Sequence, residues 1–222
     1  MARKTNNKIR TKHLILCEGR DAEEVLITYL NSEALSDTPS FSNDFQVMDF
    51  GGNSDLTNFI KALKNMEGFD KVESILVIRD AERDIARATN DITNALRHCD
   101  LSVPTRAHNW QGTSPKVGYL LFPTCDVSVQ TGTLEDLCLS ILSEDRSHEI
   151  IDDIQEFMNE VGEKYNRIYP HEFKTKLHAY FSITDSYVSL KIGEAAKAGA
   201  FNWSNAKLLP LKNFLLEVLQ VQ

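Results

Sequence analysis

The spacing of apolar residues changes along the chain from alternating strand and helix patterns to helix patterns alone. Four short apolar runs have the length of strands, and residues with helical periodicity follow each of them. The strand runs lie between His13 and the Glu18-Gly19 pair and over Phe45–Phe50, Val72–Ile78 and Val117–Phe122, and the helices end at Leu30, cover Asp55–Met66, end at about Cys99 and begin at Leu134. This order predicts an α/β fold with a mainly parallel four-stranded sheet flanked by helices.

Strand patterns fade beyond Glu144, and we see neither an internal repeat nor a low-complexity linker. Helical patterns cover about His148–Val161, Glu172–Phe181, Leu190–Ala198 and Lys207–Leu219. We therefore predict one domain over residues 1–222, made of a basic arm (1–12), an α/β core (13–144) and a helical C-terminal extension (145–222).

Composition restricts how the protein could contact nucleic acid. The chain has 222 residues, 42% of them hydrophobic, and can bury a sizeable core. Its net charge of −8 argues against a surface that coats DNA or RNA by bulk electrostatics. A nucleic-acid site would have to be focal, or built on metal ions.

The first twelve residues and the cysteines bear on partners and location. Residues 1–12 carry five basic side chains and no acid, which fits either an arm that binds phosphates or a solvated terminus. Four cysteines without a CxxC pair, no apolar signal segment and no apolar run of membrane length predict a reduced, cytoplasmic protein without a membrane partner.

Acidic residues follow three of the four predicted strands. Glu18 follows the first, Asp80 and Glu82 the third, and Glu135 with Asp136 lies beyond the fourth. Parallel strands end at one edge of a sheet, so these carboxylates can converge, and clustered carboxylates repel one another unless a cation holds them. Mg²⁺ suits such a set because it takes one or two carboxylates, waters and phosphate oxygens.

Acids in the first turn of a helix need no such explanation. A carboxylate at a helix N-terminus is stabilised by the helix dipole. For Asp21, Glu23 and Glu24 we favour that structural role over a functional one.

Short motifs at these strand ends carry a resemblance to a known group of domains. Leu16-Cys17-Glu18-Gly19-Arg20-Asp21 resembles the "VEGxxD" opening of Toprim domains, and Val77-Ile78-Arg79-Asp80-Ala81-Glu82 resembles their DxD strand end. An "FP…G-x-LED" segment at Phe122 to Asp136 and a late segment at Lys174 to Phe201 are similar to a Toprim-like family, DUF3226. The resemblance covers nearly the whole chain and implies a Toprim-like, Rossmann-like fold related to the Toprim regions of OLD-family nucleases.

The resemblance also implies roles for individual residues. Glu18 would act in acid/base chemistry, and Lys176, or else Lys174, would stabilise a phosphate transition state. The expected ligands of Mg²⁺, or of Mn²⁺ in its place, are Asp80, Glu82, Glu135, Asp136 and Asp84. This chain has DxE where the family pattern has DxD, and the longer glutamate loosens the metal geometry.

For the other candidate residues we favour structural roles. Gly51-Gly52-Asn53-Ser54 could hold a phosphate but fits neither a GxGxxG nor a Walker pattern, so we predict a turn with Ser54 as a helix cap. Trp110 could stack a base or anchor its polar loop on the core, and we favour the anchor. Cys17 should be a buried hydrophobe, and the six histidines form no HExxH motif.

Three functions remain open from the sequence. The first is an Mg²⁺-dependent phosphotransfer enzyme, most specifically a nuclease acting on DNA or RNA. The second is a catalytically inactive module that binds a nucleotide or a partner. The third is an assembly subunit that forms a homo-oligomer through the helical C-terminal third.

Overall fold

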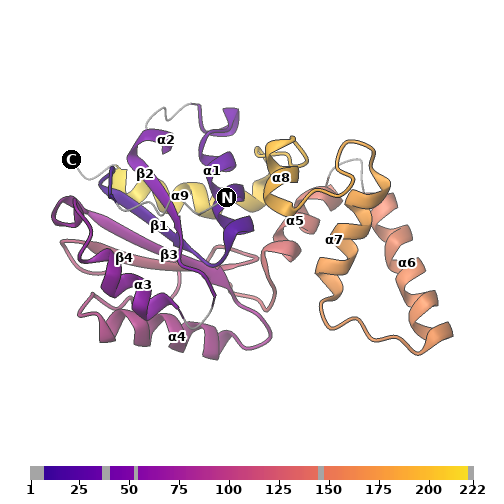
Figure 1. Cartoon of the computed structure of the whole chain (residues 1–222), viewed down its shortest axis with the longest axis horizontal. Coiled ribbons are helices and arrows are strands. Elements are labelled where there is room, and N and C mark those ends of the chain that lie inside the picture. The colour runs from indigo at the N-terminus through magenta and orange to yellow at the C-terminus, as the bar shows by residue number, and fades with distance from the viewer. Residues whose placement is uncertain (1–7, 37–40, 53–54, 145–147, 220–222) are drawn as a thin grey trace.

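The computed structural model describes residues 8–36, 41–52, 55–144 and 148–219. Four parallel strands form one sheet in the order β2-β1-β3-β4, with β1 at His13–Cys17, β2 at Phe45–Asp49, β3 at Ser74–Asp80 and β4 at Lys116–Phe122. Helices lie on both faces of this sheet (Figure 1). The predicted α/β fold with a mainly parallel four-stranded sheet flanked by helices is confirmed.

Successive side chains along each strand point to opposite faces of the sheet, and helices bury both faces. Leu14 and Leu16 face one cluster with helices α3 (Leu56–Leu63) and α4 (Ile85–His98). Ile15 and Cys17 face the other, larger cluster. That second face is covered by α1 (Arg20–Leu30), α5 (Leu134–Glu144), α8 (Ile192–Lys197) and α9 (Leu209–Leu219), as Figure 1 shows.

The helical C-terminal third is confirmed, and its parts differ in position. Helices α8 and α9 pack on the core, whereas α6 (His148–Tyr165) and α7 (Glu172–Ile183) form a hairpin at one side of the molecule (Figure 1). The predicted boundary at residue 145 stays a prediction, because α8 and α9 bury side chains in the same cluster as the sheet.

Most boundaries lie close to those predicted from the pattern, and the differences have local causes. Strand β3 runs through Arg79 to Asp80, so the first acid of the DxE motif is the last residue of the strand. Helix α6 continues to Tyr165, past the predicted Val161. The short elements η1 (Glu33–Leu35) and α2 (Phe41–Asp44) lie between α1 and β2. Ser54, the predicted cap of α3, lies outside the described residues.

Trp110 anchors its loop to the core, as we favoured. Its indole Nε1 donates to the Phe214 carbonyl oxygen at 3.2 Å, and the two rings stack at 4.6 Å. Gly118 on β4 leaves room for this pair, since a Cβ there would lie 2.9 Å from each ring. Helix α9 can therefore approach the sheet closely.

The first described residues pair with the opposite end of the sheet from the acids. Ile9 is buried, and its amide donates to the Glu67 carbonyl oxygen at 3.0 Å. Residues 8–12 of the predicted basic arm are therefore part of the folded structure, and residues 1–7 lie outside the described range. No helix among the described residues is long and apolar enough to cross a membrane.

Candidate functional site

The carboxyl ends of the strands bring acids from distant parts of the chain to one edge of the sheet. We call the set of Glu18, Asp80, Glu82 and Glu135 the carboxyl-edge cluster. Glu18 directly follows β1, and its amide donates to the Ile78 carbonyl oxygen of β3 at 3.3 Å. The N-terminus of α5 closes the same edge, because the Leu134 amide donates to Asp80 Oδ1 at 2.8 Å.

Asp80 is at the centre of this cluster. Burial raises the pKa of its carboxyl group to about 7, and the neighbouring charge of Glu135 adds to the increase. The hydrogen bond from the Leu134 amide opposes the increase, and Glu18 and Glu82 contribute further to it. Without a cation, Asp80 is therefore a carboxyl group that is costly to ionise near neutral pH.

Glu18 lies beside the buried Arg79, whose side chain is 3% exposed. The distance from Arg79 Nε to Glu18 Oε2 is 3.4 Å, and neither atom has a hydrogen-bond partner although both are buried. Burial raises the pKa of Glu18, and the guanidinium group only partly offsets this effect. Glu18 Oε2 is thus a buried acceptor without a donor.

A backbone bridge positions Glu82. Its amide and carbonyl exchange two hydrogen bonds of 2.8 Å with Gly132, in the loop before α5. Glu82 has a φ of 55°, which is uncommon for a residue with a side chain. The bridge joins the two loops that carry the DxE motif and the acids of α5, so it holds both sides of the cluster together.

Asp84 and Asp136 have capping roles that the sequence analysis did not assign. Asp84 Oδ1 accepts from the Arg87 amide at 2.9 Å and caps α4. Asp136 Oδ2 accepts from the amide and the hydroxyl group of Thr133, at 2.8 and 2.9 Å. Burial raises the pKa of Asp136, and these bonds oppose the increase. Their predicted role as metal ligands stays a prediction.

The structure favours Lys174 over Lys176 as the lysine near the acids. Lys174 Nζ lies 3.7 Å from Glu135 Oε1. None of the ion pairs in the described part of the chain involves Lys176. Arg83 adds a second link to the same region, because its Nη2 donates to the Pro170 carbonyl oxygen at 3.0 Å. The α6–α7 hairpin is therefore tied to the carboxyl edge.

The acids in the first turns of α1 hold α8 in place. Asp21 Oδ1 accepts from the Gly193 amide at 3.1 Å, and Glu24 pairs with Arg20 and Lys197 at 2.9 and 3.1 Å. For these two acids the contacts agree with the structural role that we favoured.

Two residues important for the edge were missed from the sequence. Asp49, the last residue of β2, accepts from the amides of Gly19 and Gly51 at 3.0 and 2.7 Å and so fixes the turn that carries Glu18. Arg79 also binds Asp91 of α4, at 3.5 Å. An arginine inside an otherwise apolar strand is a signal for a buried partner, and it was present in the sequence.

The predicted roles of the glycine turn and of Cys17 agree with what the structure shows. Gly51 has a φ of 90° and forms a turn with Asp49, while Asn53 and Ser54 lie outside the described residues. Cys17 is buried, and burial raises the pKa of its thiol well above the ordinary value, as for a small hydrophobe. The four cysteines are all free and buried.

The acids of the carboxyl-edge cluster could bind a divalent cation only with few protein ligands. Among the described residues, no three His, Cys, Asp or Glu side chains are grouped closely enough to hold a metal ion. Mg²⁺ needs fewer, since one or two carboxylates with waters suffice. The orphaned Glu18 Oε2 and the costly charge of Asp80 fit a hard cation bound in this way.

Comparisons with known proteins identify the family to which the chain belongs. None of the curated proteins searched matches the chain. Among solved structures, the C-terminal region of the OLD protein of Xanthomonas campestris pv. campestris is similar, with 14% identity, a TM-score of 0.48 and coverage of 93% of this chain and 95% of that one. The profile of the family described as protein of unknown function (DUF3226) matches residues 12–220, and the chain therefore belongs to the DUF3226 family.

Proposed function

We propose that this protein is a phosphotransfer enzyme that uses Mg²⁺ or Mn²⁺, and specifically a nuclease that hydrolyses a phosphodiester bond of DNA or RNA. The observation that carries the proposal is the state of Asp80. Its carboxyl group is buried among other acids at the carboxyl edge, with a pKa of about 7 in the absence of a cation. Perturbed carboxylates at the carboxyl end of a parallel sheet are a common feature of active sites.

Each acid of the cluster has a role in this proposal. Asp80 would hold the ion together with Glu82 or Glu135, and waters would take its remaining positions. A bound Mg²⁺ would polarise the phosphoryl oxygen and lower the pKa of a bound water. Glu18, whose Oε2 lacks a hydrogen-bond donor, would accept or deliver a proton at the reacting oxygen.

Lys174 would provide positive charge for the transferred phosphoryl group. In the structure its ammonium group is 3.7 Å from Glu135 and half exposed, so it is free to turn toward a substrate. A cation beside the developing charge of a phosphoryl transition state stabilises it electrostatically. Lys176 stays the alternative from the sequence.

The acidic surface also favours a metal-dependent site. With a net charge of −8, the chain repels a phosphate backbone over most of its surface. A divalent ion at the carboxyl edge would reverse the sign locally and bridge the acids to a phosphate. DNA or RNA would then bind at one place and not along a broad surface.

Cleavage of labelled DNA and RNA with Mg²⁺ or Mn²⁺ tests the proposal. The comparison is between the wild type and Asp80→Asn, which keeps the acceptor for the Leu134 amide but removes the charge. We expect the variant to lose at least about 100-fold in the rate of cleavage, the scale of losing one catalytic group.

The matched control is Asp70→Asn, the same chemical change at an exposed aspartate at the opposite end of the sheet. It should cleave like the wild type. No cleavage by the wild type with either metal, or equal cleavage by Asp80→Asn, would refute the nuclease proposal.

A binding module without catalysis is the second candidate, and the contacts of Arg79 favour it. Its guanidinium already supplies a positive charge beside Glu18, and the DxE motif has a longer second acid than DxD. Such a module would bind a nucleotide or a partner at the same edge. Calorimetry separates the two candidates, because only the enzyme requires Mn²⁺ binding that Asp80→Asn removes.

A further inference from the structure

Exposed apolar residues gather on the α6–α7 hairpin and the turn after it. Of the ten large hydrophobic side chains exposed in the described part of the chain, seven lie between positions 150 and 188: Ile150, Phe157, Tyr165, Ile168, Phe173, Ile183 and Val188. Apolar exposure gathered in one region is typical of an interaction surface, whereas scattered exposure is not. The hairpin is therefore the strongest candidate for a contact with another molecule.

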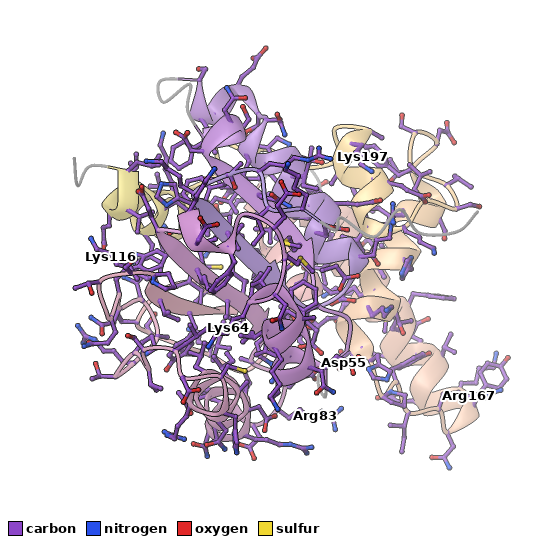
Figure 2. The ribbon with its side chains drawn as sticks, turned by 60° about the vertical axis from the view of Figure 1, so that its left-hand side comes forward. Asp55, Lys64, Arg83, Lys116, Arg167 and Lys197 are labelled. Atoms are coloured by element: carbon purple, nitrogen blue, oxygen red, sulfur yellow. The ribbon has the colours of Figure 1, made fainter. Side chains whose placement is uncertain are left out.

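Helix α6 is the outer helix of this hairpin. Figure 1 shows α7 between α6 and the rest of the molecule, and Figure 2 shows Arg167 at the far end of the hairpin, away from the other labelled residues. The inner side of α6 is occupied, because Ile151, Ile154 and Met158 are buried in the main core cluster. Its outer side has no covering element among the described residues.

Two exposed apolar residues lie along the border between this outer side and the buried side of the helix. Ile150 and Phe157 are 41% and 64% exposed, and their spacing of two helical turns places them in one line. Asp153 and Glu160 have the same spacing and lie beside that line, both exposed. We call these four residues the α6 strip.

The charge of α6 is strongly of one sign. The helix carries six acids, all exposed, namely Glu149, Asp152, Asp153, Glu156, Glu160 and Glu163. Its basic residue, Lys164, lies in the last turn, next to the tip where Arg167 lies. The apolar line of the α6 strip is thus bordered by negative charge along most of its length.

This charge pattern indicates which kind of molecule would bind the α6 strip. In a symmetric dimer the same patch of each copy faces the other, so two acidic borders would meet and repel. A partner with apolar residues in one line and lysines or arginines beside it would satisfy both features. We propose that the α6 strip binds a basic amphipathic helix of another protein, with Phe157 as the main apolar contact.

The test uses two synthetic peptides of about 18 residues, long enough for five helical turns. Both contain the same leucines and lysines, arranged as an amphipathic helix in one and dispersed in the other. We expect the full chain to bind the amphipathic peptide, and binding to weaken about tenfold for Phe157→Ser, the size of effect that loss of one aromatic contact produces. Asp153→Asn combined with Glu160→Gln should weaken binding mainly at low salt.

The matched control is Leu209→Ser on α9, a hydrophobic residue with a similar exposure of 50% outside the hairpin. It should bind like the wild type, and equal melting temperatures of all variants exclude unfolding as the cause. Equal binding of both peptides, no effect of Phe157→Ser, or an equal loss in Leu209→Ser would overturn the proposal. A wild-type dimer that Phe157→Ser converts to a monomer would also overturn it, since the occupant would then be a second copy.

Discussion

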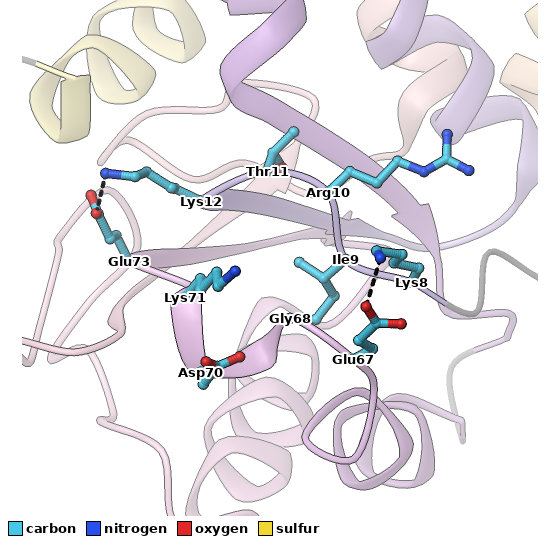
Figure 3. A pocket seen from close by; sticks show the side chains of 10 residues that line it. All are labelled: Lys8, Ile9, Arg10, Thr11, Lys12, Glu67, Gly68, Asp70, Lys71 and Glu73. Atoms are coloured by element: carbon cyan, nitrogen blue, oxygen red, sulfur yellow. Dashed lines mark hydrogen bonds and ion pairs between the residues drawn. The ribbon is translucent and has the colours of Figure 1, made fainter.

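Both ends of the central sheet carry acidic and basic side chains, but the pKa values of the acids shift in opposite directions at the two ends. At the amino end, residues 8–12 and five residues between positions 67 and 73 line a pocket of about 790 Å³. In this pocket Lys8 pairs with Glu67 and Lys12 with Glu73, each at 2.6 Å (Figure 3). Hydrogen bonds from these lysines lower the pKa of both glutamates. At the carboxyl end, burial raises the pKa of Glu18 and of Asp80.

The difference shows that burial and pairing with a cation, and not the residue type, decide the direction in which the pKa of an acid shifts here. Charges at the amino end are paired and exposed, and need nothing further. At the carboxyl end Glu18 and Asp80 are largely withdrawn from solvent, with Arg79 beside Glu18 and Lys174 near Glu135, so a bound cation would lower the free energy of their charged forms.

The largest effect on stability is expected for Asp80→Asn in the absence of metal. The folded-state pKa of about 7 lies above the ordinary 3.8, so the folded state binds the Asp80 proton more tightly than the unfolded state. The protonated Asp80 carboxyl group contributes its full stabilisation below about pH 4, and this stabilisation is lost as the pH rises to about 7. Removing the charge should stabilise the protein at pH 8 by up to about 4 kcal/mol.

Urea unfolding in a chelating buffer measures this effect. The difference between Asp80→Asn and the wild type should be larger at pH 8 than at pH 5. The same difference at both pH values would mean that the Asp80 carboxyl group does not titrate as the structure indicates.

Arg79→Met is expected to have the next largest effect. The variant keeps the unbranched apolar stem of the side chain but leaves Glu18 and Asp91 without their buried cation. Breaking a buried ion pair by removing one partner costs about 3 kcal/mol. Chemical denaturation at pH 7 checks the value, and a loss much below 1 kcal/mol would show that Arg79 does not compensate these acids.

The smallest effect is expected for Glu73→Gln at the amino end. The Lys12–Glu73 pair is largely exposed, and exposed pairs contribute little because water and salt screen them. The melting temperature should stay within about 2 °C of the wild-type value. A shift as large as that of Arg79→Met would remove the contrast between the two ends.

The sequence was sufficient for the sheet and for the position of the acids. Strand-length apolar runs that alternate with helical patterns identified all four strands, and the parallel order then placed Glu18 and Asp80 at one edge. These features depend on the spacing of apolar residues, which can be recognised within a short segment of the sequence.

Features that depend on side-chain direction across distant segments could not be predicted. The pairing of Lys174 with Glu135 and the bridge between Glu82 and Gly132 follow from how α7 and the loop before α5 dock, and no short motif encodes either contact. Asp136, whose role as a metal ligand stays a prediction, also accepts a hydrogen bond from Thr133 three residues away, a common use of an acid in the first helical turn.

The contact of Gly118 with Trp110 and Phe214 also has a consequence for how the chain folds during synthesis. Trp110 donates to a carbonyl group 104 residues later in the chain. All four strands leave the ribosome long before α9 does, so the face of β4 around Gly118 remains in contact with water during that interval. The sheet can assemble early, but this part of the core can close only when the residues of α9 have been made.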